Sequence, residues 1–114
     1  MSFSELEKKR IGKLVGTFCD MRVPEKVRDQ LKNGFRIEGQ NVFIFESRPR
    51  WDQPREWMNL DFAKLTYVKS RGVWKLYWKR ASGKWNLYEP HAKSRDLSQL
   101  IKTIDEDQYG CFFG

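Results

Sequence analysis

The sequence predicts an α+β fold: an antiparallel sheet of about five strands, a hairpin followed by a three-stranded meander, with N- and C-terminal helices packed on one face. Apolar residues repeat at helical spacing near both ends of the chain, and between them the pattern changes to alternation interrupted by glycine-containing turns. A length of 114 residues suits one compact core, so we expect residues 1–114 to form a single domain.

The N-terminal helix is predicted over about residues 4–20. Ser4 and Glu7 have the spacing of a capping box, and apolar residues follow on one helical face: Ile11, Leu14, Val15 and Phe18. Pro24 is expected to open a short second helix, with Val27 and Leu31 facing inward.

The hairpin is predicted after Gly34, where Phe35 and Ile37 alternate with charged residues. Residues 39–41 turn the chain into a second apolar segment, 42–45. A loop over residues 48–54 should follow, because its two prolines cannot donate to a sheet ladder.

Residues 62–88 are expected to form the meander, with two-residue turns at 71–72 and 82–83. These turns set Lys64 opposite Lys79 and divide the strands into two faces. The core face gathers Ala63, Leu65, Tyr67, Trp74, Leu76, Trp78, Trp85 and Leu87. The opposite face gathers Lys64, Thr66, Val68, Lys75, Tyr77, Lys79, Asn86 and Tyr88.

A final helix is predicted after Ser94 or Asp96, either of which can cap it, with core residues Leu97, Leu100, Ile101 and Ile104. The tail, residues 109–114, is unusually apolar for a chain end. We expect it to dock on its own core, the alternative being a contact with a neighbouring chain.

Positive charge is concentrated in the meander. The chain has 22 basic and 15 acidic residues, a net charge of +7. Residues 62–88 contain seven of the basic residues and no acidic one, and the remaining basic and acidic residues balance. This segment therefore carries the field that would attract an anionic partner.

The composition favours a soluble cytoplasmic protein of bacterial type. No apolar run approaches the roughly 20 residues that cross a bilayer, so no membrane partner is expected. The first residues lack the basic and apolar regions of a secretion signal. Cys19 and Cys111 are far apart and are interpreted as thiols, although a bridge between them is the alternative.

Several motifs together are similar to those of a known family. Residues 36–40 (RIEGQ), 48–52 (RPRWD), 71–78 (RGVWKLYW), 88–90 (YEP) and 107–114 (DQYGCFFG) resemble, in the same order, a family of small bacterial proteins catalogued only as a domain of unknown function. The resemblance runs nearly end to end and implies a single bacterial domain, but it brings no activity or ligand.

The basic face of the meander is the main candidate site. Tyrosine rings flanked by lysines can stack on bases while ammonium groups meet phosphates, so we expect a binding module for nucleic acid or another polyanion. Arg48 and Arg50, beside an indole in the loop, are further candidates as a phosphate clamp, the alternative being a structural role. The candidate residues are Lys64, Lys75, Tyr77, Lys79, Tyr88, Arg48 and Arg50.

Other function classes remain as alternatives. A protein-interaction or oligomerisation domain would use the sheet face, or Phe112 and Phe113, to form a homo-oligomer. An enzyme is less favoured, and no catalytic residue, metal site or cofactor is predicted. The groups considered are a His91–Cys111 pair, the same pair with Cys19 around zinc, and a metal-dependent nuclease centre built from Glu38, Glu46, Asp52 and Asp61.

Overall fold

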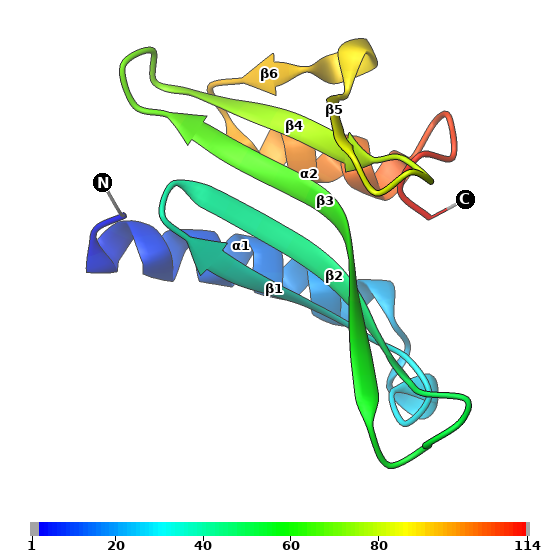
Figure 1. Ribbon diagram of the computed structural model, residues 1–114. Coiled ribbons are helices and arrows are strands. Elements are labelled where there is room, and N and C mark those ends of the chain that lie inside the picture. Colours follow the sequence, from blue (N-terminus) through cyan, green and yellow to red (C-terminus); the bar gives the residue numbers. More distant parts are fainter. Residues whose placement is uncertain (1–2, 114) are drawn as a thin grey trace.

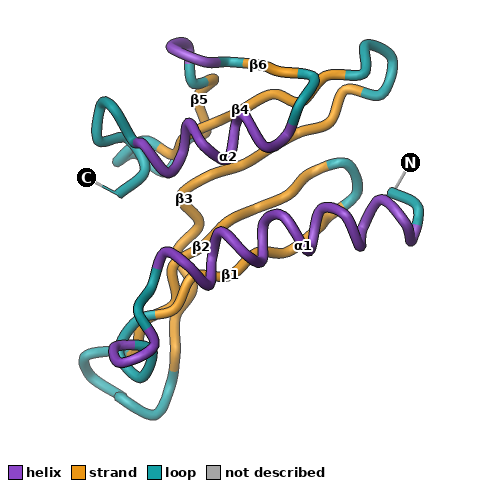
Figure 2. Tube along the Cα trace, turned by 180° about the vertical axis from the view of Figure 1, so that it is seen from behind, coloured by secondary structure: helices purple, strands orange, loops and turns teal. Residues whose placement is uncertain are grey.

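The computed structural model describes residues 3–113, and it places two helices on one face of a six-stranded antiparallel sheet (Figures 1 and 2). The strands follow the order β1-β2-β3-β4-β5, and β6 pairs with β4. The elements are α1 (Glu5–Arg22), η1 (Glu25–Val27), β1 (Lys32–Glu38), β2 (Asn41–Pro49), β3 (Trp57–Val68), β4 (Val73–Lys79), β5 (Trp85–Leu87), η2 (Glu89–His91), β6 (Lys93–Ser94) and α2 (Leu97–Glu106).

Helix α1 lies behind β1 and β2 in Figure 1 and in front of them in Figure 2, and α2 lies likewise against β4, so each helix covers a different half of the sheet. The predicted α+β class and the placement of both helices on one face are confirmed. The core lies between these layers. Its fully buried members include Val15, Val42, Ile44, Leu65, Leu76, Leu100 and Ile104.

The capping box at the start of α1 forms as expected. The Glu7 carboxylate accepts from the Ser4 amide at 2.9 Å, and the Ser4 hydroxyl accepts from the Glu7 amide at 3.2 Å. The predicted second helix is reduced to the single turn η1, which buries no residue. The amides of Gln30 and Leu31 both donate to the carbonyl of Val27, and β1 then begins, which leaves no length for further helical turns.

Strands β1 and β2 form the expected hairpin around a two-residue turn. Glu38 pairs with Asn41, and Gly39 takes a positive φ of 60° that favours glycine. The loop predicted over residues 48–54 is shifted, because β2 continues through Pro49 and β3 begins only at Trp57. Pro49 is tolerated because it is the last residue of its strand.

A β-bulge at Phe62 changes which side of β3 faces the helices. Ile44 pairs with Ala63, but the next residue of β2, Phe45, pairs with Asp61. Phe62 is therefore the extra residue, and its ring packs against Phe113, 4.9 Å away between centroids. The bulge moves Asp61 to the side of the sheet away from the helices.

The meander is confirmed, but both of its predicted turns are too short. Val68 pairs with Val73, so the first loop has four residues, 69–72, and Lys64 lies opposite Tyr77 rather than Lys79. That shift of two residues preserves the faces of β3 and β4.

At the second turn, the predicted register differs from the observed one by one residue. Each side chain of the last strand therefore points to the opposite face from the one predicted. Lys79 pairs with Trp85 and Tyr77 pairs with Leu87, around the loop 80–84. Trp85 and Leu87, predicted in the core, share the face of the lysines. Tyr88, predicted on that face, is instead buried with 2% of its surface exposed.

The C-terminal tail docks on its own chain. Asp96 caps α2 by accepting from the Ser98 amide at 2.9 Å, and Asp107 ends the helix with a left-handed φ of 42°. The two Asp107 carboxylate oxygens accept from the amides of Phe112 and Phe113 at 2.9 and 2.8 Å. The Phe112 ring then packs 5.0 Å from that of Tyr88.

Candidate functional site: the open cationic sheet face

In the part of the chain that the structure describes, no helix covers the second face of the sheet (Figures 1 and 2), which we call the open face. A single row of directly opposed residues crosses it from β1 to β5, and cationic and aromatic side chains alternate along most of its length. The row is Arg36, Phe43, Lys64, Tyr77 and Leu87.

The cations of this row lie over aromatic rings. The Arg36 guanidinium is 4.4 Å from the centre of the Phe43 ring, and the Lys64 ammonium is 4.8 Å from that of Tyr77. Trp85 leans over the row from β5, with its ring 6.0 Å from that of Phe43 and 5.8 Å from the Lys64 ammonium. These side chains are half-buried, largely by one another.

A second row of directly opposed residues lies beside the first on the open face, and it ends at a lysine. Asn41, Thr66 and Lys75 are directly opposed, and the Thr66 hydroxyl donates to the Asn41 side-chain oxygen at 2.6 Å. Lys75 lies opposite Lys93 of β6, where two like charges on neighbouring strands repel. An anionic ligand would relieve this repulsion.

Among the described residues, the lysines of the open face differ from its arginine in having no carboxylate within ion-pair distance. Arg36 donates to both Asp61 oxygens, at 2.7 and 2.9 Å, and also to Glu38. No such partner lies beside Lys64, Lys75 or Lys79. The charge available to an outside anion is therefore that of these three ammonium groups.

The Arg36–Asp61 pair makes stability depend on pH. Hydrogen bonds from the Arg36 guanidinium lower the pKa of Asp61 below its usual range. A carboxyl group with a lowered pKa stabilises the fold fully above its unfolded-state pKa of about 3.9, and this contribution is lost as the pH falls through the folded value. Asp61→Asn should therefore flatten the acid side of the stability curve, measured by urea denaturation between about pH 2 and 7. Equal slopes for both proteins would contradict this role.

The seven candidate binding residues do not form one site. Lys64, Lys75, Tyr77 and Lys79 share the open face, whereas the placement of Tyr88 there is wrong. The predicted site residues do not include Arg36, Phe43 or Trp85, which the structure places on the open face. Continuing the alternation of residues 42–45 across to the meander would have placed Phe43 beside Lys64, but that needed the pairing of β2 with β3.

The two candidate arginines are engaged elsewhere. Arg48 forms an ion pair with Glu46, and because it lies five positions after Phe43 along β2 it is on the other side of the strand. Arg50 pairs with Asp52 and Glu56, at 2.9 and 3.2 Å. A structural role for the loop is therefore confirmed in the pairing of Asp52 with an arginine, but not as a cap of the core by Trp51, since 93% of Trp51 is exposed.

Of the carboxylates considered for catalysis, Glu38 and Asp61 both accept from Arg36, whereas Asp52 pairs with Arg50. The Cys19 thiol is 3% exposed, and burial raises its pKa to about 12. Burial also raises the pKa of Cys111, while His91 contacts the Thr103 hydroxyl. Over residues 3–113, no three side chains among His, Cys, Asp and Glu are grouped so that they could hold a metal ion.

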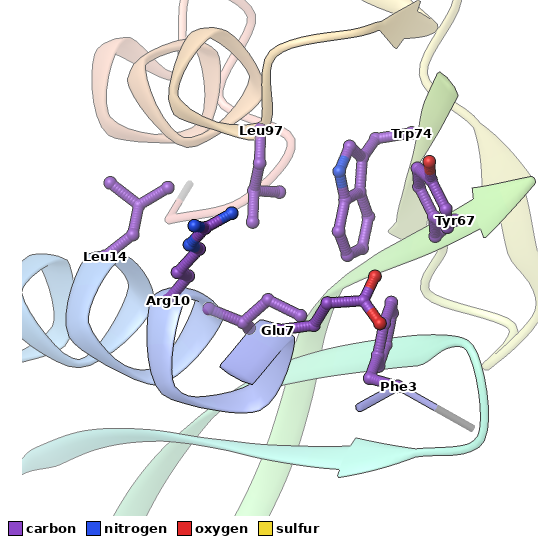
Figure 3. A pocket seen from close by; sticks show the side chains of 8 residues that line it. Phe3, Glu7, Arg10, Leu14, Tyr67, Trp74 and Leu97 are labelled. Atoms are coloured by element: carbon purple, nitrogen blue, oxygen red, sulfur yellow. The ribbon is translucent and has the colours of Figure 1, made fainter. Parts of the chain in front are cut away.

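The helix side of the sheet has a separate cavity of about 240 Å³ near the start of α1 (Figure 3). Its aromatic wall is formed by Phe3 and Trp74, stacked with 5.5 Å between ring centres, and by Tyr67. Arg10 and Glu7 lie at its rim (Figure 3). The Glu7 carboxylate is already used in the capping box, so the cavity offers an outside ligand mainly apolar surface.

These features define a small α+β domain with a helix-covered face and an open cationic, aromatic face. The chain matches the family described as Domain of unknown function (DUF3024) over residues 3–114, and it belongs to that family. Searches of curated proteins and of solved structures found no match. Within the described part of the chain, no helix is long and apolar enough to cross a membrane.

Proposed function

We propose that this protein is a binding module for single-stranded nucleic acid, which it holds on the open face. The observation that carries the proposal is the row of alternating cations and rings formed by Arg36, Phe43, Lys64 and Tyr77. Single-strand binders combine a cationic track for the phosphates with aromatic side chains on which bases stack, and the row supplies both.

Binding would exchange one set of contacts for another. In the free protein, the Lys64 ammonium covers the rings of Tyr77 and Trp85. A phosphate would draw this flexible side chain away from the rings, because an ammonium–phosphate contact is stronger than a solvent-exposed cation–π contact. The ring faces would then be free to stack on bases, so the free protein keeps its aromatic surface covered until a ligand arrives.

Charge reversal on the open face tests this proposal. The triple variant Lys64→Glu/Lys75→Glu/Lys79→Glu should reduce affinity for labelled single-stranded RNA or DNA by at least about 100-fold at low salt, because three phosphate contacts become repulsive. Wild-type affinity should fall with salt, with a logarithmic slope of about −2 for three such contacts on a single strand. Fluorescence anisotropy measures both.

A matched variant separates the site from the overall charge. Lys9→Glu/Lys13→Glu/Lys26→Glu changes the net charge equally at exposed lysines outside the open face, and it should lose much less affinity. Equal losses in both triple variants, or no binding by the wild-type protein at low salt, would contradict the proposal.

The role of the rings needs its own variant. Trp85→Ala should weaken single-strand binding by about 5- to 150-fold if a base stacks there. It should leave the binding of inorganic polyphosphate, which has no bases, nearly unchanged. Equal affinities of wild type and Trp85→Ala for nucleic acid would indicate that the open face binds polyanions in general.

A further inference from the structure

Strand β1 ends at Lys32, opposite Ser47, and beyond it β2 and β3 continue as a short two-stranded ladder that ends in the loop 50–56 (Figure 1). We call residues 48–60 the arm. Every residue from 51 to 60 is exposed, and four of them are large and apolar: Trp51, Trp57, Met58 and Leu60. Met58 and Leu60 share one face of β3, whereas Trp57 lies on the other face, where the Lys32 ammonium is 4.7 Å from the centre of its ring. Two neighbouring exposed apolar side chains on one face make the arm a candidate contact surface.

One edge of the arm has no strand beside it. The pairing of β4 with β3 ends at Ala63, while β3 continues to pair with β2 down to Trp57. The backbone groups of residues 57–60 that point away from β2 therefore have no neighbouring strand among the described residues. Such an edge is a template for another strand.

The arm is held in shape before any partner arrives. Across its loop, the Arg50 amide donates to the Glu56 carbonyl at 2.8 Å, and the Glu56 amide donates to the Gln53 carbonyl at 2.9 Å. The Arg50 guanidinium also holds the carboxylates of Asp52 and Glu56. A preformed edge loses little conformational entropy when it pairs.

The chemistry of this edge indicates what it pairs with. Natural edges are usually protected by lysine, proline or an inward charge, yet the edge sequence Trp57-Met58-Asn59-Leu60 contains none of these. We propose that the edge of β3 pairs antiparallel with the same edge of a second copy of this chain, forming a dimer with one continuous sheet.

Two-fold symmetry restricts the register of such a pair. With Asn59 on the axis, Met58 lies opposite Leu60 of the second copy, and the two Asn59 side chains face each other. Over residues 58–60, this register places apolar residues opposite apolar ones and an amide opposite an amide, and at its ends Trp57 lies opposite Asp61 of the second copy, so no like charges are opposed. The axis runs perpendicular to the sheet, so the open faces of both copies lie on the same side.

Sedimentation velocity over a wide concentration range tests the dimer. The wild-type protein should associate, and Leu60→Lys should raise the dimer dissociation constant by about tenfold or more, because the symmetric contact is lost twice. Leu6→Lys is the matched control: Leu6 is 60% exposed and Leu60 is 50% exposed, and Leu6 lies on α1. It should leave association unchanged.

A double variant tests the register independently of any loss of folding. Met58→Lys alone should weaken the dimer, whereas Met58→Lys/Leu60→Glu should restore it with new sensitivity to salt, because the introduced charges face each other across the axis. A monomeric wild-type protein would overturn the proposal, as would a dimer that Leu60→Lys leaves intact. A double variant no better than the single one would overturn this register.

Discussion

Replacing Tyr88 with alanine is expected to lower the free energy of unfolding by about 3–5 kcal/mol, the usual cost of removing a buried aromatic side chain. Tyr88 is the largest of the fully buried side chains, and its ring packs 5.0 Å from that of Phe112. The alanine variant would leave a cavity between the sheet and the tail. Urea denaturation followed by tryptophan fluorescence measures the loss.

Two further substitutions show whether the ring itself is responsible. Tyr88→Phe keeps the ring and should cost no more than about 1.5 kcal/mol. Tyr109→Ala removes a tyrosine that is 63% exposed in the same C-terminal region, and its effect should stay within about 0.5 kcal/mol. If Tyr88→Ala were as mild as Tyr109→Ala, Tyr88 could not lie in the core.

Asp107→Ala should destabilise the protein by about 3 kcal/mol. It removes the acceptor of two backbone hydrogen bonds from the tail, and bonds to a charged group are worth about 1.5–3 kcal/mol each before allowance for solvent. It also forces alanine into the left-handed conformation, with a φ of 42°, at roughly 1 kcal/mol.

The order of three variants separates these two contributions. Asp107→Gly loses the hydrogen bonds but adopts the left-handed conformation easily, so it should be less harmful than Asp107→Ala. Asp107→Asn tolerates that conformation and keeps one acceptor oxygen, so it should be the mildest. Thermal unfolding ranks them, and equal effects of alanine and asparagine would show that the carboxylate does not hold the tail.

The helices and the first hairpin could be predicted because their signals are local. Ser4 and Glu7 form the expected capping box, Asp96 caps the final helix, and Gly39 makes the two-residue turn. The turns of the meander could not be predicted in this way. Gly72 and Gly83 each have a positive φ, yet they are the last and the next-to-last residues of longer loops, and the sequence does not say where within a loop the glycine lies.

The candidate site shows how one such error changes the chemistry. The register predicted at the first turn was in error by two residues, an even number, so Lys64 and Tyr77 were still assigned to the correct face. An error of one residue in the register at the second turn placed Tyr88 on the open face and Trp85 in the core, whereas the structure has Trp85 on the open face and Tyr88 in the core. The bulge at Phe62 was also beyond prediction, since it depends on the pairing of two strands that are separated by a loop.

The order of the strands also has a kinetic consequence. From β1 to β5, each strand pairs with the next one along the chain, so most of the sheet is assembled by closing short loops. Folding rates fall as contacting residues become more distant in sequence, and a meander keeps those distances small. Formation of the sheet should therefore be fast for a β-rich protein. The contact of Arg22 with Phe113 and with Asp105, which is 83 positions away, has a much longer loop to close.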